Sequence, residues 1–165
     1  MLNTLKILNI RFVITIIICM ITLGVLNGCS GKKEGGNSFS ATEIGEKMKR
    51  VTNLEKMREG DSKQLQKLYN ISTDEVESFA IYTAPTNIKA DEIAIMKVKD
   101  TKNVETIKGK ILNRIENKSK SFKDYLPDEY FLIEKHVLKT KDNYILLAIS
   151  KDADKIEKMF DETLK

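Results

Sequence analysis

Two pairs of strand-like segments, each followed by a helical segment, constrain the fold of this chain more than any other feature of its sequence. The first pair covers residues 79–83 and 93–98, and the second covers residues 136–140 and 143–149. Each pair is rich in β-branched and aromatic residues and has a short polar connection, which favours antiparallel pairing. The order hairpin, helix, hairpin, helix predicts an α+β fold. We expect a two-layer sandwich with a largely antiparallel four-stranded sheet.

Capping patterns mark helices before the first hairpin. Ser40 is followed three residues later by Glu43, which is the pattern of a capping box, and an apolar stripe at helical spacing continues to Val51. Asp61 is a second candidate N-cap, and Asn70 is a candidate left-handed C-cap. The sequence therefore predicts N-terminal helices from about residue 41 and over residues 61–69.

Three further signals locate the later helices. A long amphipathic segment predicts a helix over about residues 101–123, with Gly109 as its weak point. Pro127 favours the first turn of a short helix that runs to Ile133. A last helix is expected after a cap near Ser150 or Asp152. Ser72 and Glu75 repeat the capping pattern, so a turn or so of helix is also expected there.

The N-terminus has the layout of a bacterial signal peptide. Lys6 and Arg11 precede an almost uninterrupted apolar run from Phe12 to Leu26, and no acidic residue occurs before Glu34. A membrane-spanning helix needs roughly 20 apolar residues. The run is shorter than that, so cleavage is favoured over permanent spanning.

The apolar run ends in a motif that resembles the lipobox of bacterial lipoproteins. Leu26 and Gly28 precede Cys29, which predicts cleavage between Gly28 and Cys29 and a diacylglyceryl group on the cysteine sulfur. The only other cysteine, Cys19, would be removed with the signal, so no disulfide is expected. The predicted organisation is a lipoprotein signal peptide over residues 1–28, an acylated cysteine with a flexible tether over residues 29–38, and a single α+β domain over residues 39–165.

Net charge argues against nucleic acid as a partner. The whole chain carries +4, of which Lys6 and Arg11 belong to the predicted signal, so the mature protein is near +2. The long helix is nevertheless rich in cations, which spread around its surface and favour a solvated face. Contact with anionic headgroups or wall polymers is the alternative reading of these residues: Lys102, Lys108, Lys110, Arg114, Lys118, Lys120 and Lys123.

Three segments resemble a family of small lipoproteins from clostridia and their relatives. They are residues 90–94 (ADEIA), 121–127 (SFKDYLP) and 143–150 (NYILLAIS). The resemblance extends from about Ser40 to Leu164 and departs at the second hairpin turn, where Asp142 stands in place of an expected Gly. That family carries only an unknown-function label, so the resemblance implies a surface lipoprotein and no mechanism.

No motif for catalysis, cofactor binding or metal binding is visible. His136 is the only histidine, and its place in a strand favours a packed or edge residue over a general base. Asp152 and Asp154 begin like a calcium loop, but Ile156 stands where an oxygen ligand is needed, so they are read as helix N-terminal carboxylates. Phosphate-loop and nucleophile-elbow motifs are also missing. We therefore expect no catalytic residue, cofactor or metal, and a protein that is not an enzyme.

These observations predict a lipoprotein anchored at the outer face of the bacterial cytoplasmic membrane. Its expected role is non-enzymatic binding or scaffolding at the cell envelope, with an envelope protein or an anionic polymer as partner. An accessory binding protein for a small solute or an anionic wall polymer is the alternative, and a hydrolase with a dispersed active site is the least favoured. Tyr82, Tyr125, Tyr130 and Tyr144 are candidates to line a binding groove, although such residues usually pack in a core.

Overall fold

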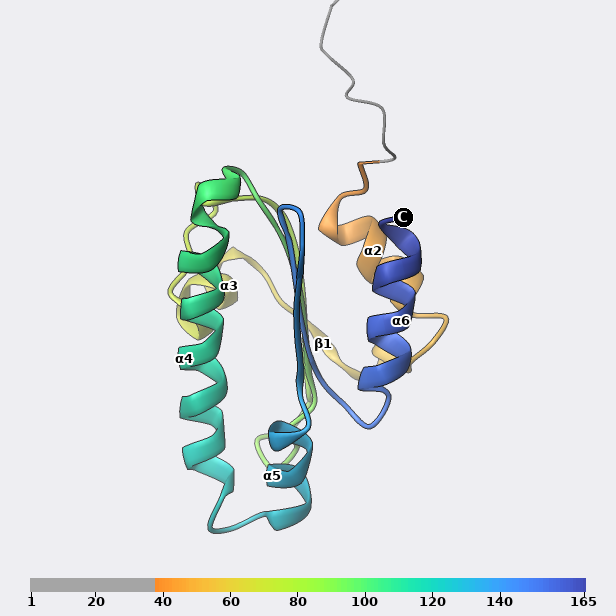
Figure 1. Ribbon diagram of the computed structural model, residues 1–165. Helices are drawn as coiled ribbons and strands as arrows, with labels where there is room; N and C mark the ends of the chain where they lie inside the picture. Colours follow the sequence, from red (N-terminus) through yellow and green to blue (C-terminus); the bar gives the residue numbers. More distant parts are fainter. Residues whose placement is uncertain (1–37) are drawn as a thin grey trace, which may run out of the picture. The chain divides into compact units, whose positions relative to one another are not determined.

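Five antiparallel strands form one open sheet at the centre of the molecule (Figure 1). The structure is a computed structural model, and it describes residues 38–165. The strand order is β1-β2-β3-β5-β4, so β3 lies in the middle and the two hairpins join through β3 and β5. The strands are β1 (Arg58–Glu59), β2 (Val76–Thr83), β3 (Glu92–Val98), β4 (Val137–Lys141) and β5 (Tyr144–Ile149).

Helices cover both faces of this sheet. Figure 1 shows the sheet nearly edge-on, with α3 and α4 on one side and α2 and α6 on the other, while α5 lies near one end. The helices are α2 (Ala41–Met48), α3 (Ser62–Tyr69), α4 (Val104–Phe122), α5 (Pro127–Glu134) and α6 (Ala153–Thr163), with short 3-10 turns η1 (Leu54–Lys56) and η2 (Thr101–Asn103).

The α+β class and the antiparallel sheet are confirmed, whereas the two-layer, four-stranded arrangement is wrong. Every residue of β3 and β5 is buried, and alternate side chains enter two separate cores. Ala94 and Leu147 belong to the core beneath α4, while Ile95 and Leu146 belong to the core beneath α2 and α6. A strand that is apolar on both faces needs cover on both faces, which a single helical layer cannot provide.

The predicted helix ends follow from local hydrogen bonds. Ser40 and Glu43 form the complete capping box of α2, and the side chain of Asp61 accepts from the backbone N–H of Gln64 at the start of α3. Asn70 ends α3 with φ 56°, in the left-handed region. Around Ser72 the chain forms only a turn before β2, instead of the expected turn of helix.

One strand and one turn residue differ from the usual pattern. The fifth strand, β1, is only two residues long and pairs with Tyr82 and Thr83 at the edge of the sheet. In the second hairpin, Asp142 takes the turn position with φ 53°, which explains why Gly would be the usual residue there.

The chain enters the domain beside the central strands. The Nζ of Lys97 in β3 donates to Oγ of Ser38 at 2.6 Å, and the hydroxyl of Tyr144 in β5 donates to the carbonyl oxygen of Phe39 at 2.6 Å. The start of α2 is therefore fixed to the sheet by hydrogen bonds as well as by its apolar face.

The predicted signal peptide, the Gly28–Cys29 cleavage site and residues 29–37 of the tether lie outside the described residues. Within residues 38–165, none of the helices combines the length and the apolar character that crossing a membrane requires.

Candidate functional site

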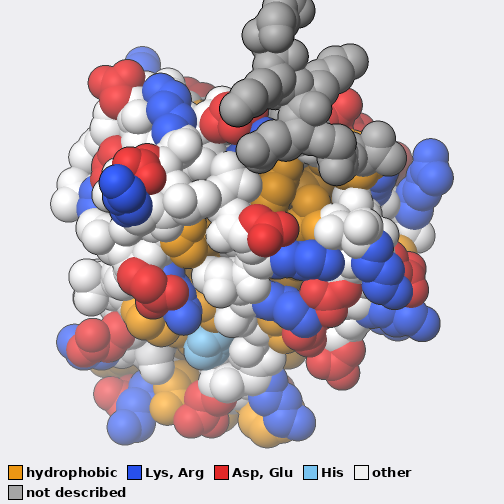
Figure 2. Space-filling view, turned by 45° about the horizontal axis from the view of Figure 1, so that its top comes forward, with side chains coloured by type: hydrophobic (Ala, Val, Ile, Leu, Met, Phe, Trp, Pro, Cys, Tyr) orange, Lys and Arg blue, Asp and Glu red, His pale blue; other side chains and the backbone are white. Residues whose placement is uncertain are grey.

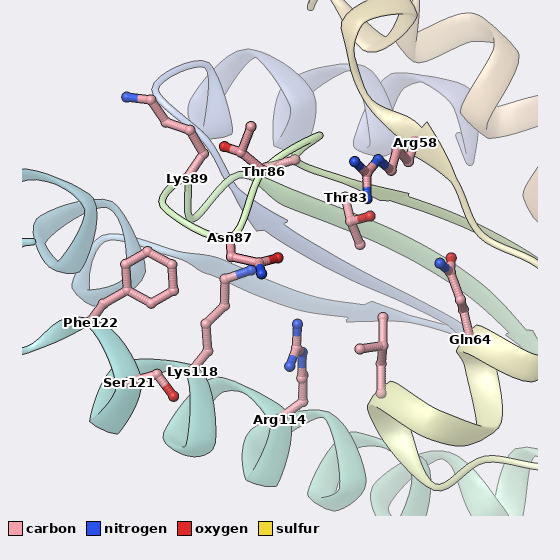
Figure 3. Close-up of a pocket in the computed structure, with 12 residues that line it drawn as sticks. Arg58, Gln64, Thr83, Thr86, Asn87, Lys89, Arg114, Lys118, Ser121 and Phe122 are labelled. Atoms are coloured by element: carbon pink, nitrogen blue, oxygen red, sulfur yellow. The ribbon is translucent and has the colours of Figure 1, made fainter.

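A pocket of about 380 Å³ opens between α4 and the end of the sheet where β2 turns toward β3 (Figure 3). Its walls come from β1, α3, the β2–β3 loop and the second half of α4. Basic and neutral polar side chains form most of the lining, with a few apolar groups between them: Arg58, Gln64, Leu68, Thr83, Ala84, Thr86, Asn87, Lys89, Arg114, Lys118, Ser121 and Phe122.

A buried carboxylate, Glu92 at the start of β3, holds two of these cations in place. Its side chain is fully inaccessible to solvent. Arg114 donates to it through Nε at 3.0 Å and Nη2 at 2.7 Å, and Lys118 donates through Nζ at 2.6 Å. The hydroxyl of Tyr69 in α3 supplies a fourth hydrogen bond at 2.6 Å. One carboxylate thus connects α3, β3 and α4.

The charges of this cluster change the acidity of its members. Burial alone would raise the pKa of Glu92, but hydrogen bonds from Arg114 and the charge of Lys118 lower the pKa to about 2. Burial and the adjacent Glu92 raise the pKa of Tyr69 well above its ordinary value. Burial lowers the pKa of Lys118, and Glu92 only partly offsets that effect. Glu92 is therefore ionised at neutral pH, and Tyr69 remains a neutral donor.

Glu92 leaves both cations with hydrogen-bonding capacity. It uses two of the five guanidinium N–H groups of Arg114 and one of the three N–H groups of Lys118. Arg58, which reaches the pocket from β1, forms no ion pair with any residue that the structure describes. The charges of Arg58, Arg114 and Lys118 together exceed the charge of Glu92 by two positive units, which favours an anion.

The rim of the pocket is joined to α5 by a separate ion pair. Lys89 of the β2–β3 loop lies 2.5 Å from Oε1 of Glu129, whose Oε2 accepts from the backbone N–H of Ala90 at 2.7 Å. Figure 3 shows the Lys89 side chain directed away from Arg114 and Lys118. This pair is neutral overall, so Lys89 does not add to the charge inside the pocket.

Gln64 is the least satisfied polar group of the lining. Its Oε1 is buried and has no hydrogen-bond partner within residues 38–165. The oxygen packs against Gly60, where a Cβ would come within 2.7 Å of it, so the chain needs a small residue at this point.

Of the residues singled out in the sequence, Arg114 and Lys118 line this pocket, whereas the four tyrosines and His136 do not. Tyr82 and Tyr144 are buried in the core beneath α2 and α6, Tyr125 is exposed, and Tyr130 packs at the edge of the other core. His136 lies just before β4, with its Nδ1 2.7 Å from the carbonyl oxygen of Ile133.

The two aspartates read as helix N-terminal residues lie at the start of α6. Asp152 pairs with Lys155 there. In residues 38–165, no three His, Cys, Asp or Glu side chains come together as a metal site.

The expectation of a solvated cationic face is wrong for part of α4. Lys118 is buried and Arg114 is largely covered, and both turn toward the sheet. The sequence contained a signal for this position, because Lys118 follows Ile111 and Ile115 at helical spacing and is followed by Phe122 in the same apolar stripe. A lysine inside such a stripe indicates a buried carboxylate partner.

One face of the domain carries charged side chains of both signs. On the face shown in Figure 2, basic and acidic side chains alternate and no broad area of one sign appears. Elsewhere in the domain, Lys139 of β4 is neutralised by Glu157 and Asp161 of α6. The pocket therefore offers a more concentrated positive charge than this face does.

Comparison with known proteins gives one match. A family model described as a domain of unknown function (DUF4358) matches residues 50–150, which include all of the sheet and the whole pocket lining. No curated protein and no solved structure matches the chain.

Proposed function

The chain belongs to the DUF4358 family, a domain of unknown function, and from this premise we propose that it is a non-enzymatic binding module for an anionic ligand. The ligand would occupy the pocket between α4 and the β2–β3 loop. Through a lipid on Cys29, the module would be held at the outer face of the bacterial cytoplasmic membrane. The family match agrees with the resemblance to lipoproteins that carry only an unknown-function label.

The excess of cations inside the pocket is the observation that carries this proposal. Arg58, Arg114 and Lys118 line the pocket, and a single buried carboxylate, Glu92, pairs with Arg114 and Lys118. Glu92 also fixes the positions of Arg114 and Lys118 before any ligand arrives. Cations that are already held in place lose little conformational entropy on binding, which favours affinity.

The size and lining of the pocket support binding over catalysis. Small-molecule sites commonly have volumes of about 300–1,000 Å³, and this pocket has about 380 Å³. Its hydroxyl groups come from Thr83, Thr86 and Ser121, and its described lining contains no histidine or carboxylate that could act as a general base beside them.

The lipid anchor rests on the sequence. Lys6 and Arg11, the apolar run and the motif that ends at Cys29 support export and acylation. Anchoring would keep the pocket within reach of ligands at the membrane surface or in the wall. An anchored module of this kind agrees with the alternative drawn from the sequence, an accessory protein for a small solute or an anionic polymer.

Ligand titration tests the anion proposal. Citrate and inorganic phosphate would be titrated into the purified full-length protein in detergent at low ionic strength, with binding followed by calorimetry. We expect saturable binding that Arg58→Gln weakens about tenfold, since a hydrogen bond to a charged group contributes about 1.5–3 kcal/mol. Arg50→Gln is the matched control, because Arg50 is exposed and lies outside the pocket. Absence of binding, or equal weakening by both substitutions, would refute the proposal.

Scaffolding of an envelope protein is the second candidate function. It is favoured by three large apolar side chains that remain exposed near α5 and the β2–β3 loop: Ile88 (63%), Tyr125 (83%) and Phe131 (52%). Crosslinking in cells would compare the captured neighbours of the native protein with those of the triple variant Ile88→Ser, Tyr125→Ser, Phe131→Ser. A discrete protein captured only by the native protein would support scaffolding, and identical neighbours would exclude this surface as the interface.

A further inference from the structure

The pocket contains more neutral hydrogen-bonding groups than an isolated anion needs. Gln64, Thr83, Thr86 and Asn87 line the pocket beside the cations, and they come from α3, β2 and the β2–β3 loop (Figure 3). Hydroxyl and amide groups both donate and accept, so they match the hydroxyl groups of a ligand.

Aromatic surface is scarce in the same pocket. Phe122 is the only aromatic residue in the described lining, and it is only 8% exposed. Nucleobases usually stack on open aromatic rings, and stacking contributes about 1–3 kcal/mol per base. The described lining therefore lacks the open aromatic ring on which a nucleobase would stack.

The net charge distinguishes between kinds of anion. Arg58, Arg114 and Lys118 exceed the charge of Glu92 by two positive units, and Lys89 is neutralised by Glu129. A phosphate monoester carries about −1.5 to −2 at pH 7 and offers three acceptor oxygens. A monocarboxylate or a phosphodiester carries only one negative charge. A monoester therefore balances the pocket, whereas the other two leave a cation without compensation.

We propose that the ligand is a polyol phosphate, bound as its monoester dianion. This inference rests on the proposed anion-binding function and names the ligand class for the same site. The phosphate oxygens accept from the free N–H groups of Arg58, Arg114 and Lys118. The polyol hydroxyls lie against the β2–β3 loop, where Asn87 and Thr86 are exposed and available.

Four probes test the ligand class on the purified full-length protein. They are sn-glycerol 3-phosphate, its carboxylate counterpart glycerate, inorganic phosphate and glycerol, each titrated under identical conditions. We expect sn-glycerol 3-phosphate to bind at least about tenfold more tightly than glycerate or inorganic phosphate, a difference of about 1.4 kcal/mol, and glycerol not to bind. Equal affinity for sn-glycerol 3-phosphate and inorganic phosphate would overturn the polyol assignment, and equal affinity for glycerate would overturn the phosphate assignment. Either result is compatible with the proposed anion-binding function. If none of the anions binds, both that function and the polyol phosphate assignment are refuted.

A pair of variants separates recognition of the polyol from recognition of the phosphate. Asn87→Ala should weaken sn-glycerol 3-phosphate several-fold and leave inorganic phosphate unchanged, since Asn87 is placed to contact hydroxyl groups. Asn113→Ala is the control, because Asn113 is exposed on α4 outside the pocket. Equal effects of Asn87→Ala on both ligands would contradict the assignment.

A lipid headgroup is the other source of a glycerol phosphate group. Phosphatidylglycerol presents the group as a monoanionic diester, and its water-soluble short-chain form would be compared with short-chain phosphatidylcholine by titration into the purified full-length protein. The proposal expects no more binding to phosphatidylglycerol than to phosphatidylcholine. Strong binding to phosphatidylglycerol without binding of sn-glycerol 3-phosphate would overturn it in favour of the membrane surface.

Discussion

The hydroxyl of Tyr69 donates a hydrogen bond of 2.6 Å to Oε1 of Glu92, and both side chains are buried. This bond connects α3 with β3 beneath the candidate pocket. The same carboxylate receives Arg114 and Lys118 from α4, so three elements depend on one acidic residue. Glu92 therefore affects both the stability of the domain and the positions of the cations that face the pocket.

Replacing Glu92 by Gln should destabilise the domain by about 3 kcal/mol, because the substitution leaves a buried lysine and a largely covered arginine without a counter-charge. Chemical denaturation of the native and variant proteins measures this effect. Glu116→Gln is the control, since Glu116 also pairs with a lysine of α4 but is 62% exposed. We expect almost no change for the control. A Glu92→Gln protein as stable as the native one would show that the carboxylate is not needed to balance the cluster.

The same carboxylate should give the domain an acid-dependent component of stability. The pKa of Glu92 is about 2 in the folded protein, compared with an ordinary value of 4.5, so its contribution is complete above about pH 4.5 and is lost as the pH falls toward 2. The shift corresponds to about 3 kcal/mol. Unfolding free energies measured between pH 7 and pH 2 should fall less steeply for Glu92→Gln than for the native protein. Parallel pH profiles would contradict the assignment of this component to Glu92.

Replacing two helical glycines by alanine should change the stability of the domain in opposite directions. A Cβ on Gly45 in α2 would come within 2.7 Å of the Tyr82 hydroxyl and 3.1 Å of the Cβ of Ala80, whereas a Cβ on Gly109 in α4 would meet no atom within 4 Å. Gly45→Ala should therefore destabilise the domain by about 1–3 kcal/mol through overpacking. Gly109→Ala should stabilise it by about 1 kcal/mol through helix propensity. Thermal unfolding of the two variants side by side checks both signs, and a shift of the two in the same direction would contradict the packing around Gly45.

Cys29 should determine whether the protein is anchored. Cys29→Ala is expected to leave unprocessed precursor and to abolish metabolic labelling with a fatty acid, because the predicted acceptor sulfur is lost. Cys19→Ala is the control, since Cys19 lies within the apolar run that is expected to be removed. Normal maturation and labelling of the Cys29→Ala protein would exclude the lipoprotein assignment.

Much of the fold could be predicted because its signals are local. The capping box of Ser40 and the left-handed Asn70 each depend on residues only a few positions apart. β1 could not be predicted, since Arg58 and Glu59 carry no apolar alternation and form a strand only through pairing with β2. The second helical layer was indicated by the continuous apolar sequence of β5, which is typical of a strand buried on both faces.

The pocket was harder to predict because its residues are far apart in the sequence. Glu92 and Lys118 are separated by 26 positions, and only the fold brings them together. Lys118 could have been identified as unusual from its place in the apolar stripe of α4. Arg58 and Gln64 gave no such signal, since each is an ordinary polar residue until β1 and α3 are placed beside the β2–β3 loop.

The hydrogen bonds from Lys97 to Ser38 and from Tyr144 to Phe39 also determine how the domain would respond to force. Lys97 and Tyr144 belong to β3 and β5, which are buried along their whole length. A pull on the N-terminal end of the domain is therefore resisted first by bonds to the inner strands of the sheet, before α2 can peel away. A tensile load carried by the preceding segment would thus enter this domain through its most strongly packed strands and not through an exposed edge.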